Sequence, residues 1–282
     1  MKAFLGTGLM GSAFVSAMLA RGDKVTVWNR TLSRAALLES QGAILAPDPA
    51  TAVRDASRVH LSLLDDNAVD DVLQKLLPTL AAGAIVVDHS TTAAQSTAAR
   101  AERLSSQGVR FLHAPVFMGP ANARAATGSM LVAGPADAFE ETRHELENMT
   151  GKVRYMGARP DLAAAYKLFG NMAMMFVVSG VAEVFTLGRA LGITPRDAVT
   201  VFDDFNPGTQ IAARGQRMAD GEFTPAAFEL SAARKDIRLM LESAAAAGGS
   251  LNILPAIADR FDRIIEAGYG QADVAAVAAD IN

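Results

Sequence analysis

The sequence predicts an α/β fold in which a doubly wound parallel sheet over residues 1–160 precedes an all-α domain over residues 161–282. Two observations predict this fold. Apolar, strand-like runs alternate with helix-like segments up to about residue 158, whereas nothing after Asp161 resembles a strand. A glycine-rich turn also joins the first strand-like run to the first helix-like segment, as in nucleotide-binding β-α-β units.

The first elements form a Rossmann-type unit. A strand over 3–5 precedes the glycine turn, helix spacing follows from Ser12, and 25–28 is predicted as the second strand. The turn reads Gly6-Thr7-Gly8-Leu9-Met10-Gly11. Its first glycine allows a tight turn, its second lets backbone approach a pyrophosphate, and its third lets the helix close on the strand. A purely structural turn is the alternative, but the strand–helix–strand context favours a dinucleotide site.

The end of the second predicted strand favours NADP over NAD. An acidic residue there would bind a ribose 2′-hydroxyl, but this chain has Asn29, Arg30 and Thr31. A carboxylate would repel a 2′-phosphate, whereas Arg30 can bind one through charge-assisted hydrogen bonds. A solvated polar turn is the alternative.

The remaining elements follow from hydrophobic periodicity and from Gly and Pro positions. Further strands are predicted at 59–64, 84–88, 110–116, 129–133 and 152–156, and helices between them at 68–77, 93–107 and 136–149. The all-α part is predicted to contain helices at 161–191, 209–220, 225–247, 255–267 and 272–281. Thr194 and Pro195 fit the N-cap and first turn of another helix.

Composition excludes several classes of function. The net charge of −4 provides no basic field for nucleic acid, and the absence of cysteine excludes disulfides and thiolate chemistry. Four scattered histidines show no metal-ligand spacing, so we predict no metal site. The longest uncharged stretch, 168–182, is shorter than the roughly 20 residues of a membrane span, so we expect a buried helix in a cytoplasmic protein.

The predicted all-α part contains one candidate proton donor, Lys167. It is the only charged residue between Asp161 and Glu183, on a helix otherwise rich in Ala, Leu, Phe, Met and Val. Asn171 lies four residues later, on the same helical face. Apolar surroundings lower a lysine pKa and ease proton exchange near neutral pH, although a lysine that extends to solvent from the helix is equally compatible.

These motifs together resemble the β-hydroxyacid dehydrogenases, which include 3-hydroxyisobutyrate dehydrogenase and glyoxylate/succinic semialdehyde reductases. The glycine turn resembles the family's cofactor fingerprint, and 87–91 resembles its cofactor loop. Lys167 and Asn171 match a K-x-x-x-N motif whose lysine is catalytic and whose asparagine helps to bind substrate. The resemblance assigns Leu64, Thr91 and Lys235 to the cofactor site, with Lys235 directed toward the nicotinamide pocket.

The loop that binds substrate in this family departs from the family pattern. The usual D-A-P-V-S-G-G, whose Ser-Gly-Gly part holds a substrate carboxylate, here reads His113-Ala114-Pro115-Val116-Phe117-Met118-Gly119. Backbone N–H groups of Val116–Gly119 can still bind a carboxylate, but Phe117 and Met118 should make the pocket smaller or more apolar. Gly170 also stands where the family often has asparagine.

The resemblance implies an NADP-dependent enzyme that interconverts a small hydroxy acid and its aldehyde or keto acid, with an active site between the two domains and Lys167 as general acid. Two alternatives remain open: an imine reductase, whose relatives generally lack this lysine, and a non-catalytic NADP-binding regulatory protein. The apolar length of the 161–191 helix suggests a homodimer or homotetramer. We expect no nucleic-acid or membrane partner.

Overall fold

The computed structural model describes residues 1–281, which form two compact units. The first unit comprises Met1–Met172, and the second begins at Ala173. Helix α8 (Leu162–Ala190) contributes residues to both. Strands end with β9 (Lys152–Tyr155), so the predicted change from strands to helices is observed, while a domain boundary at 160/161 stays a prediction.

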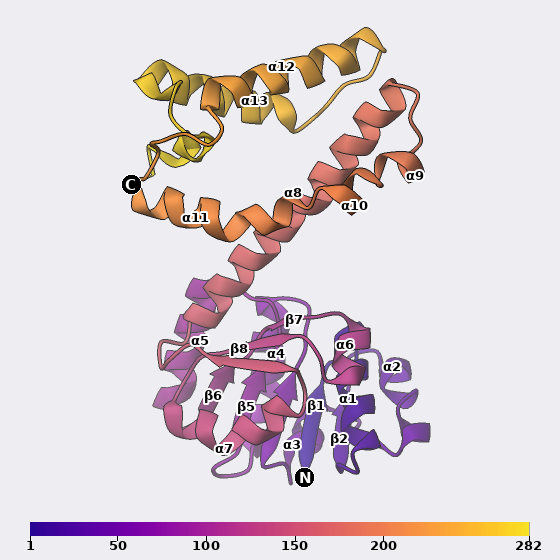
Figure 1. The fold of residues 1–282 in the computed structure, drawn as a ribbon. Coiled ribbons are helices and arrows are strands. Elements are labelled where there is room, and N and C mark those ends of the chain that lie inside the picture. Colours follow the sequence, from indigo (N-terminus) through magenta and orange to yellow (C-terminus); the bar gives the residue numbers. More distant parts are fainter. Residues whose placement is uncertain (282) are drawn as a thin grey trace. The chain divides into compact units, whose positions relative to one another are not determined.

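The first unit contains a six-stranded parallel sheet flanked by helices (Figure 1). Its strands are β1 (Lys2–Leu5), β2 (Val25–Trp28), β3 (Ile44–Leu45), β4 (Arg58–Leu61), β5 (Ile85–Asp88) and β6 (Arg110–His113). Its helices are α1 (Leu9–Ala20), α2 (Leu32–Ala36), α3 (Pro49–Val53), α4 (Asp66–Leu76), α5 (Ala94–Ser106), α6 (Pro120–Ala125) and α7 (Ala136–Glu147), with 3-10 turns η1 (Glu39–Gln41) and η2 (Leu77–Thr79). The strand order β3-β2-β1-β4-β5-β6 reverses direction at β1, which confirms the predicted doubly wound, Rossmann-type sheet.

Two apolar layers cover the sheet, because successive side chains of a strand point to opposite faces. Phe4 packs with Phe14 of α1 and Phe139 of α7 in one layer. Leu5 packs with Leu73 of α4 and other side chains of α3, α4 and α5 in the other layer. Both faces are therefore buried, which explains why these strands read as nearly continuous apolar runs in the sequence.

A separate three-stranded sheet lies beyond β6 in the chain. It contains β7 (Val116–Phe117), β8 (Ser129–Val132) and β9, with β7 antiparallel to β8 and β8 parallel to β9. The predicted single strand over 110–116 was therefore wrong at its end, and the segments 129–133 and 152–156 do not extend the main sheet. Pro115 has no N–H to donate to a strand neighbour, so the chain leaves the main sheet there.

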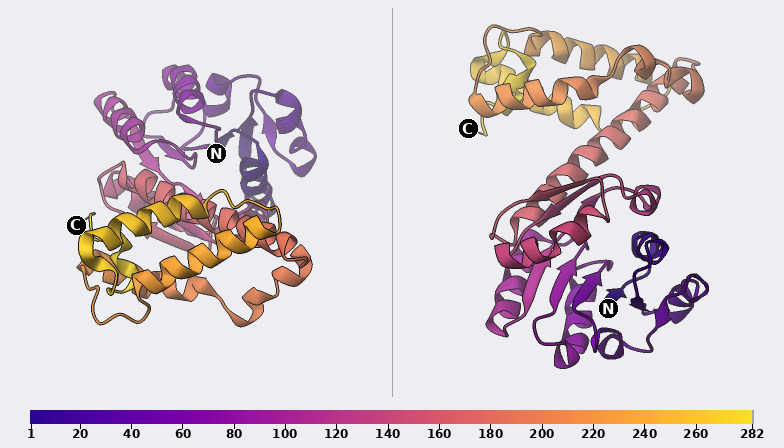
Figure 2. Two further views of the ribbon diagram at one scale, coloured as in Figure 1. Left: turned by 90° about the horizontal axis from the view of Figure 1, so that it is seen from above. Right: turned by 60° about the horizontal axis from the view of Figure 1, so that its bottom comes forward.

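The second unit is helical (Figure 2). After α8 it contains α9 (Pro195–Ala198), α10 (Val201–Asp204), η3 (Pro207–Gln210), α11 (Ile211–Asp220), α12 (Leu230–Ala246), α13 (Leu254–Ile264), a π-helical turn η4 (Ile265–Tyr269) and a 3-10 turn η5 (Val274–Ala278). Leu230, Ile237 and Phe261 form its core where α12 packs on α13. Thr194 caps α9 as predicted, by accepting a hydrogen bond from the Asp197 N–H.

Two predicted helices of this unit differ from the structure. The helix predicted at 225–247 begins only at Leu230, because the carboxylate of Asp273 accepts hydrogen bonds from the N–H groups of Ala227 and Phe228 and holds that segment as a loop. The helix predicted at 272–281 is reduced to η5.

The middle of α8 is exposed rather than buried, which corrects the prediction for residues 168–182. Its exposed apolar side chains are Leu168, Phe169, Met172, Met174, Met175, Phe176, Val177 and Val178. These apolar side chains are therefore left largely uncovered by the described part of the chain. By length and composition α8 could cross a membrane, but one such helix is weak evidence because subunit interfaces and cores have the same composition.

Candidate functional site

The glycine turn between β1 and α1 has the geometry of a dinucleotide-binding loop. Gly6 adopts a φ of +97°, and a Cβ atom there would lie 2.2 Å from the carbonyl oxygen of Ser62. A Cβ on Gly11 would lie 1.9 Å from the carbonyl oxygen of Gly6, so this position also requires glycine. A Cβ on Gly8, by contrast, would meet no atom within 4 Å. The chain itself therefore does not explain Gly8, whereas a bound pyrophosphate would.

The end of β2 lies beside this turn. The side chain of Asn29 accepts a hydrogen bond from the N–H of Thr7 at 3.0 Å and donates one to the carbonyl oxygen of Thr31 at 2.9 Å. Asn29 therefore holds the two loops together. Arg30 is exposed, and no carboxylate stands between Asn29 and Arg34.

The loops after β4 and β5 reach the same edge of the sheet. Ser90 accepts a hydrogen bond from the N–H of Leu63 at 2.9 Å, and its own N–H donates to Asp88. This contact places Leu64, which is 80% exposed, near the exposed Thr91. Leu9, which is 84% exposed, and the half-buried Met10 begin α1 at this edge. The predicted cofactor residues of the first unit therefore converge at the carboxyl ends of the strands, where ligands bind in open α/β sheets.

Lys167 reaches the predicted substrate loop. Its Nζ donates a hydrogen bond to the carbonyl oxygen of Val116 at 2.7 Å and lies 4.5 Å from the centre of the Phe117 ring. Burial lowers the pKa of Lys167. Asn171 is half-buried one turn further along α8. Lysine, asparagine and loop therefore belong to one folded unit.

Phe117 and Gly170 are fitted to one another. A Cβ on Gly170 would lie 2.4 Å from the Phe117 ring, so the ring occupies the space that a side chain at 170 would need. Phe117 in the loop and Gly170 on the helix each depart from the family pattern. Because the ring fills the space left by the missing side chain, the two departures depend on each other.

The sequence did not identify the role of Asn122. Its Oδ1 accepts a hydrogen bond from the N–H of Gly119 at 3.1 Å, so this N–H is already paired. An asparagine three residues after a glycine that begins a helix was the available signal. His113 is fully buried and is therefore a packed residue. Lys235 lies in the second unit, where it is exposed and pairs with Asp236 at 2.8 Å.

Both parts of the chain match families of nicotinamide-dependent dehydrogenases. Residues 2–157 match the NAD binding domain of 6-phosphogluconate dehydrogenase, and residues 162–280 match the family described as NAD-binding of NADP-dependent 3-hydroxyisobutyrate dehydrogenase. Among relatives, glyoxylate/succinic semialdehyde reductase 1 of Arabidopsis thaliana is 29% identical over 97% of this chain and 96% of its own length.

Two further comparisons extend these similarities. The cytokine-like nuclear factor N-PAC of Gallus gallus is 33% identical over 88% of this chain, which spans only 45% of that protein. The solved structure of an imine reductase from Streptomyces aurantiacus is 28% identical, covers 100% of this chain and 99% of its own, and superposes with a TM-score of 0.90. The same fold and similar sequences therefore occur in proteins described by different activities.

The glycine turn supports a matched pair of substitutions. Gly11→Ala should lower the unfolding temperature, because its methyl group would overlap backbone that cannot move aside. Gly8→Ala should leave that temperature within about 2 °C of wild type, a shift of a few tenths of a kcal/mol, yet weaken NADPH binding. Thermal unfolding and fluorescence titration with NADPH measure the two effects. Equal losses of stability in both variants would contradict the assignment of Gly8 to the cofactor.

Proposed function

The chain belongs to the β-hydroxyacid dehydrogenase family, an NAD(P)-dependent oxidoreductase family, and from that membership we propose that it is an NADPH-dependent reductase of small aldehydes or keto acids. In the reverse direction it would oxidise the corresponding hydroxy acid. The single observation that carries the proposal is the contact of Lys167 with the substrate loop, through the carbonyl oxygen of Val116.

The residues of the proposed cofactor site suit a dinucleotide that carries a 2′-phosphate. The open space over Gly8 would accommodate a pyrophosphate at the beginning of α1, where the N–H groups of a first helical turn favour an anion. Arg30 is exposed beside this turn and would pair with a 2′-phosphate, with Thr31 next to it. Since no carboxylate competes at this position, NADPH is the preferred dinucleotide of the proposal.

Lys167 is the proposed proton donor. NADPH, when bound, supplies the hydride that reduces the carbonyl carbon. Lys167 would then give a proton to the substrate oxygen as negative charge develops on it. Two features suit the lysine to proton donation, since burial lowers its pKa and Val116 fixes its position with one hydrogen bond. Asn171 would orient the substrate from the next turn of the helix.

The substrate loop supports a second candidate, an imine reductase. Phe117 and Met118 replace the family's Ser-Gly. In addition, the Gly119 N–H already donates a hydrogen bond to Asn122, so it is not free to bind a substrate carboxylate. These features favour a substrate without a carboxylate at that end, and the Streptomyces relative is described as an imine reductase. Lys167 is the argument against this candidate, because a lysine suits proton donation to an alkoxide.

The exposed middle of α8 supports self-association. A contiguous apolar surface of this kind is uncommon on a soluble monomer. A second copy of the chain would cover the exposed methionines and Phe176, and a homodimer or homotetramer is therefore part of the proposal. A cytoplasmic location accords with that assembly and is likewise proposed.

Cofactor preference tests the role of Arg30. Wild type should prefer NADPH over NADH by about 10- to 150-fold in kcat/KM, which corresponds to about 1.5–3 kcal/mol for a charge-assisted pair. Arg30→Ala should lose most of this preference through a higher KM for NADPH alone. Arg21→Ala removes an exposed arginine from the other end of α1 and should have no effect. A wild type that uses NADH equally well would show the assignment to be wrong.

Substrate selectivity tests the loop. The double substitution Phe117→Ser and Met118→Gly should raise kcat/KM for succinic semialdehyde relative to butanal, because it opens space and adds a hydroxyl donor for the carboxylate. Phe117→Leu keeps the loop apolar and serves as the control. Steady-state rates with both aldehydes give the ratio. An unchanged ratio would mean that this loop does not face the substrate.

Removal of Lys167 tests the enzyme proposal itself. Lys167→Met keeps the chain length and removes the proton, so kcat should fall by about 10²- to 10⁴-fold, the usual contribution of a positioned general acid. NADPH affinity should hardly change, since the proposed cofactor contacts lie in other loops. Lys152→Met, at an exposed position of strand β9, is the matched control. Near-normal kcat in Lys167→Met would favour imine reduction, which a screen of cyclic imines with NADPH would then test directly.

A further inference from the structure

A line of hydrogen bonds passes through the buried core of the first unit. His60 lies in β4, His89 directly follows β5, and both side chains are buried. The His60 Nε2 atom is 2.7 Å from Oε1 of Glu145 on α7, and the His60 Nδ1 atom is 3.0 Å from Nε2 of His89. The His89 Nδ1 atom is 2.8 Å from the carbonyl oxygen of Ala114. The line therefore joins α7 to the beginning of the substrate loop.

The partners fix which atoms donate along this line. A carbonyl oxygen only accepts, so His89 must carry a proton on Nδ1. Burial and the neighbouring His60 lower the pKa of His89 to about 3, so its ring is neutral and its Nε2 accepts. His60 must then donate from Nδ1 to His89. A lone pair on His60 Nε2 would face a carboxylate oxygen at 2.7 Å, so a proton lies there as well.

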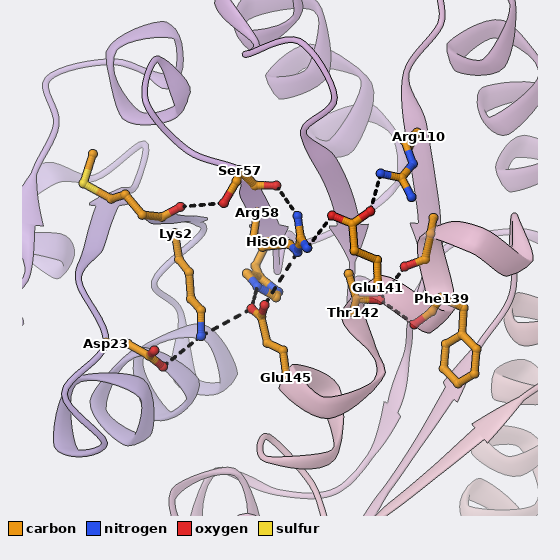
Figure 3. A network of polar contacts seen from close by, with 12 residues as sticks. Lys2, Asp23, Ser57, Arg58, His60, Arg110, Phe139, Glu141, Thr142 and Glu145 are labelled. Atoms are coloured by element: carbon orange, nitrogen blue, oxygen red, sulfur yellow. Dashed lines mark hydrogen bonds and ion pairs between the residues drawn. The ribbon is translucent and has the colours of Figure 1, made fainter.

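The carboxylate of Glu145 accepts the last of these hydrogen bonds, from the Nε2 atom of His60. Burial raises the pKa of Glu145, but the hydrogen bond from His60 and the charges of His60, Lys2 and Arg58 lower it more, to about 2. Lys2 and Arg58 lie 3.6 and 3.8 Å from the carboxylate (Figure 3). Glu145 is therefore ionised, and its 2.7 Å contact with the Nε2 atom of His60 has the length typical of a charge-assisted hydrogen bond to a carboxylate.

Aromatic rings and other charged groups surround the two histidines. His60 and His89 stack on each other with ring centres 5.3 Å apart, and Phe4 stacks on both at 5.6 and 6.3 Å. Asp88 and His113, also buried, are the other titratable groups that act on His89. Both histidine side chains are buried and bind only protein groups in the described part of the chain, so we assign neither of them a direct part in the proposed chemistry.

The inner end of the line reaches Ala114, two residues before the carbonyl oxygen that binds the proposed proton donor, Lys167. The N–H of Ala114 donates to the carbonyl oxygen of Asp88 at 2.7 Å, while its carbonyl oxygen accepts from His89. This residue is thus held on both sides. Two residues later, the carbonyl oxygen of Val116 accepts the hydrogen bond from Lys167. A rotation of the Ala114 carbonyl would therefore move the oxygen that holds the lysine.

We propose that His60 and His89 are positioning residues whose one-directional hydrogen bonds, anchored by Glu145, hold the 114–117 loop and through it Lys167. The link to catalysis rests on the function proposed above for Lys167. The arrangement of protons on the two histidines does not depend on that function. The proton arrangement and the link to catalysis can therefore be tested separately.

The protons can be observed directly by ¹⁵N NMR of histidine-labelled protein near neutral pH. We expect His89 to be neutral with its proton on Nδ1, and His60 to be protonated on both nitrogens. The exposed His144 on α7 provides an internal reference, assigned with His144→Gln. A neutral His60, or a proton on Nε2 of His89, would overturn the proposal whatever reaction the protein catalyses.

Two carboxylates on α7 provide a matched comparison. Glu145→Gln replaces the carboxylate with an amide N–H that can donate to His60, so His60 should become neutral while His89 keeps its proton on Nδ1. Glu141→Gln removes a carboxylate one turn earlier, which also pairs with Arg58 but contacts no histidine in the described part of the chain, and His60 should remain protonated. An identical His60 signal in both variants would contradict the ion pair.

Kinetics test the link to Lys167. His89→Phe removes the donor to Ala114 and keeps an aromatic ring, so kcat should fall by roughly 10- to 100-fold, the cost of misplacing a reacting group by about 1 Å. The KM for NADPH should change much less than kcat, because the His89 side chain is buried and bonds Ala114, whereas Thr91 of the same loop is exposed. His144→Phe should behave as wild type. Unchanged kcat in a folded His89→Phe protein would refute the positioning role. If that variant does not fold, His60→Gln replaces it. This substitution alters the line at the partner of His89, and the same fall in kcat is expected.

Discussion

The register of the parallel sheet is the constraint on which the first unit depends. Leu5 pairs with Leu61, Leu61 pairs with Asp88, and Asp88 pairs with His113, so four strands end level with one another. The loops that follow must therefore leave the sheet at one edge. The glycine turn of the proposed dinucleotide site, the predicted substrate loop and the contact with Lys167 all lie at that edge because four short strands share one register.

Local motifs made part of this arrangement predictable. The glycine turn, the polar residues after β2 and the lysine–asparagine spacing on α8 each depend on residues close together in the chain, and each has a direct physical meaning. The break at Pro115 was also visible in the sequence, since proline lacks the N–H that a strand interior needs. That rule places the end of the sixth strand before Pro115.

Contacts between distant segments were not predictable in the same way. His60 and His89 lie 29 positions apart, and Glu145 lies a further 56 positions along the chain, so no local pattern joins them. The fit of the Phe117 ring against Gly170 likewise couples two segments that separately look like unrelated departures from a family pattern. The exposure of α8 could not be read from composition either, because an apolar helix is equally suited to a core and to an interface.

Some buried charged side chains of the first unit have a partner of opposite charge, whereas Lys167 does not. This difference separates charges with a structural role from one that suits chemistry. Arg100 is fully buried but pairs with Asp66 and Asp70, and Glu145 pairs with His60. Such pairs offset the cost of removing each charge from water. Lys167 has no carboxylate partner among the described residues; a carbonyl oxygen and an aromatic face are its contacts, and burial alone lowers its pKa. A cation left without a counter-charge gives up a proton more easily than a paired one, which is what a proton donor requires.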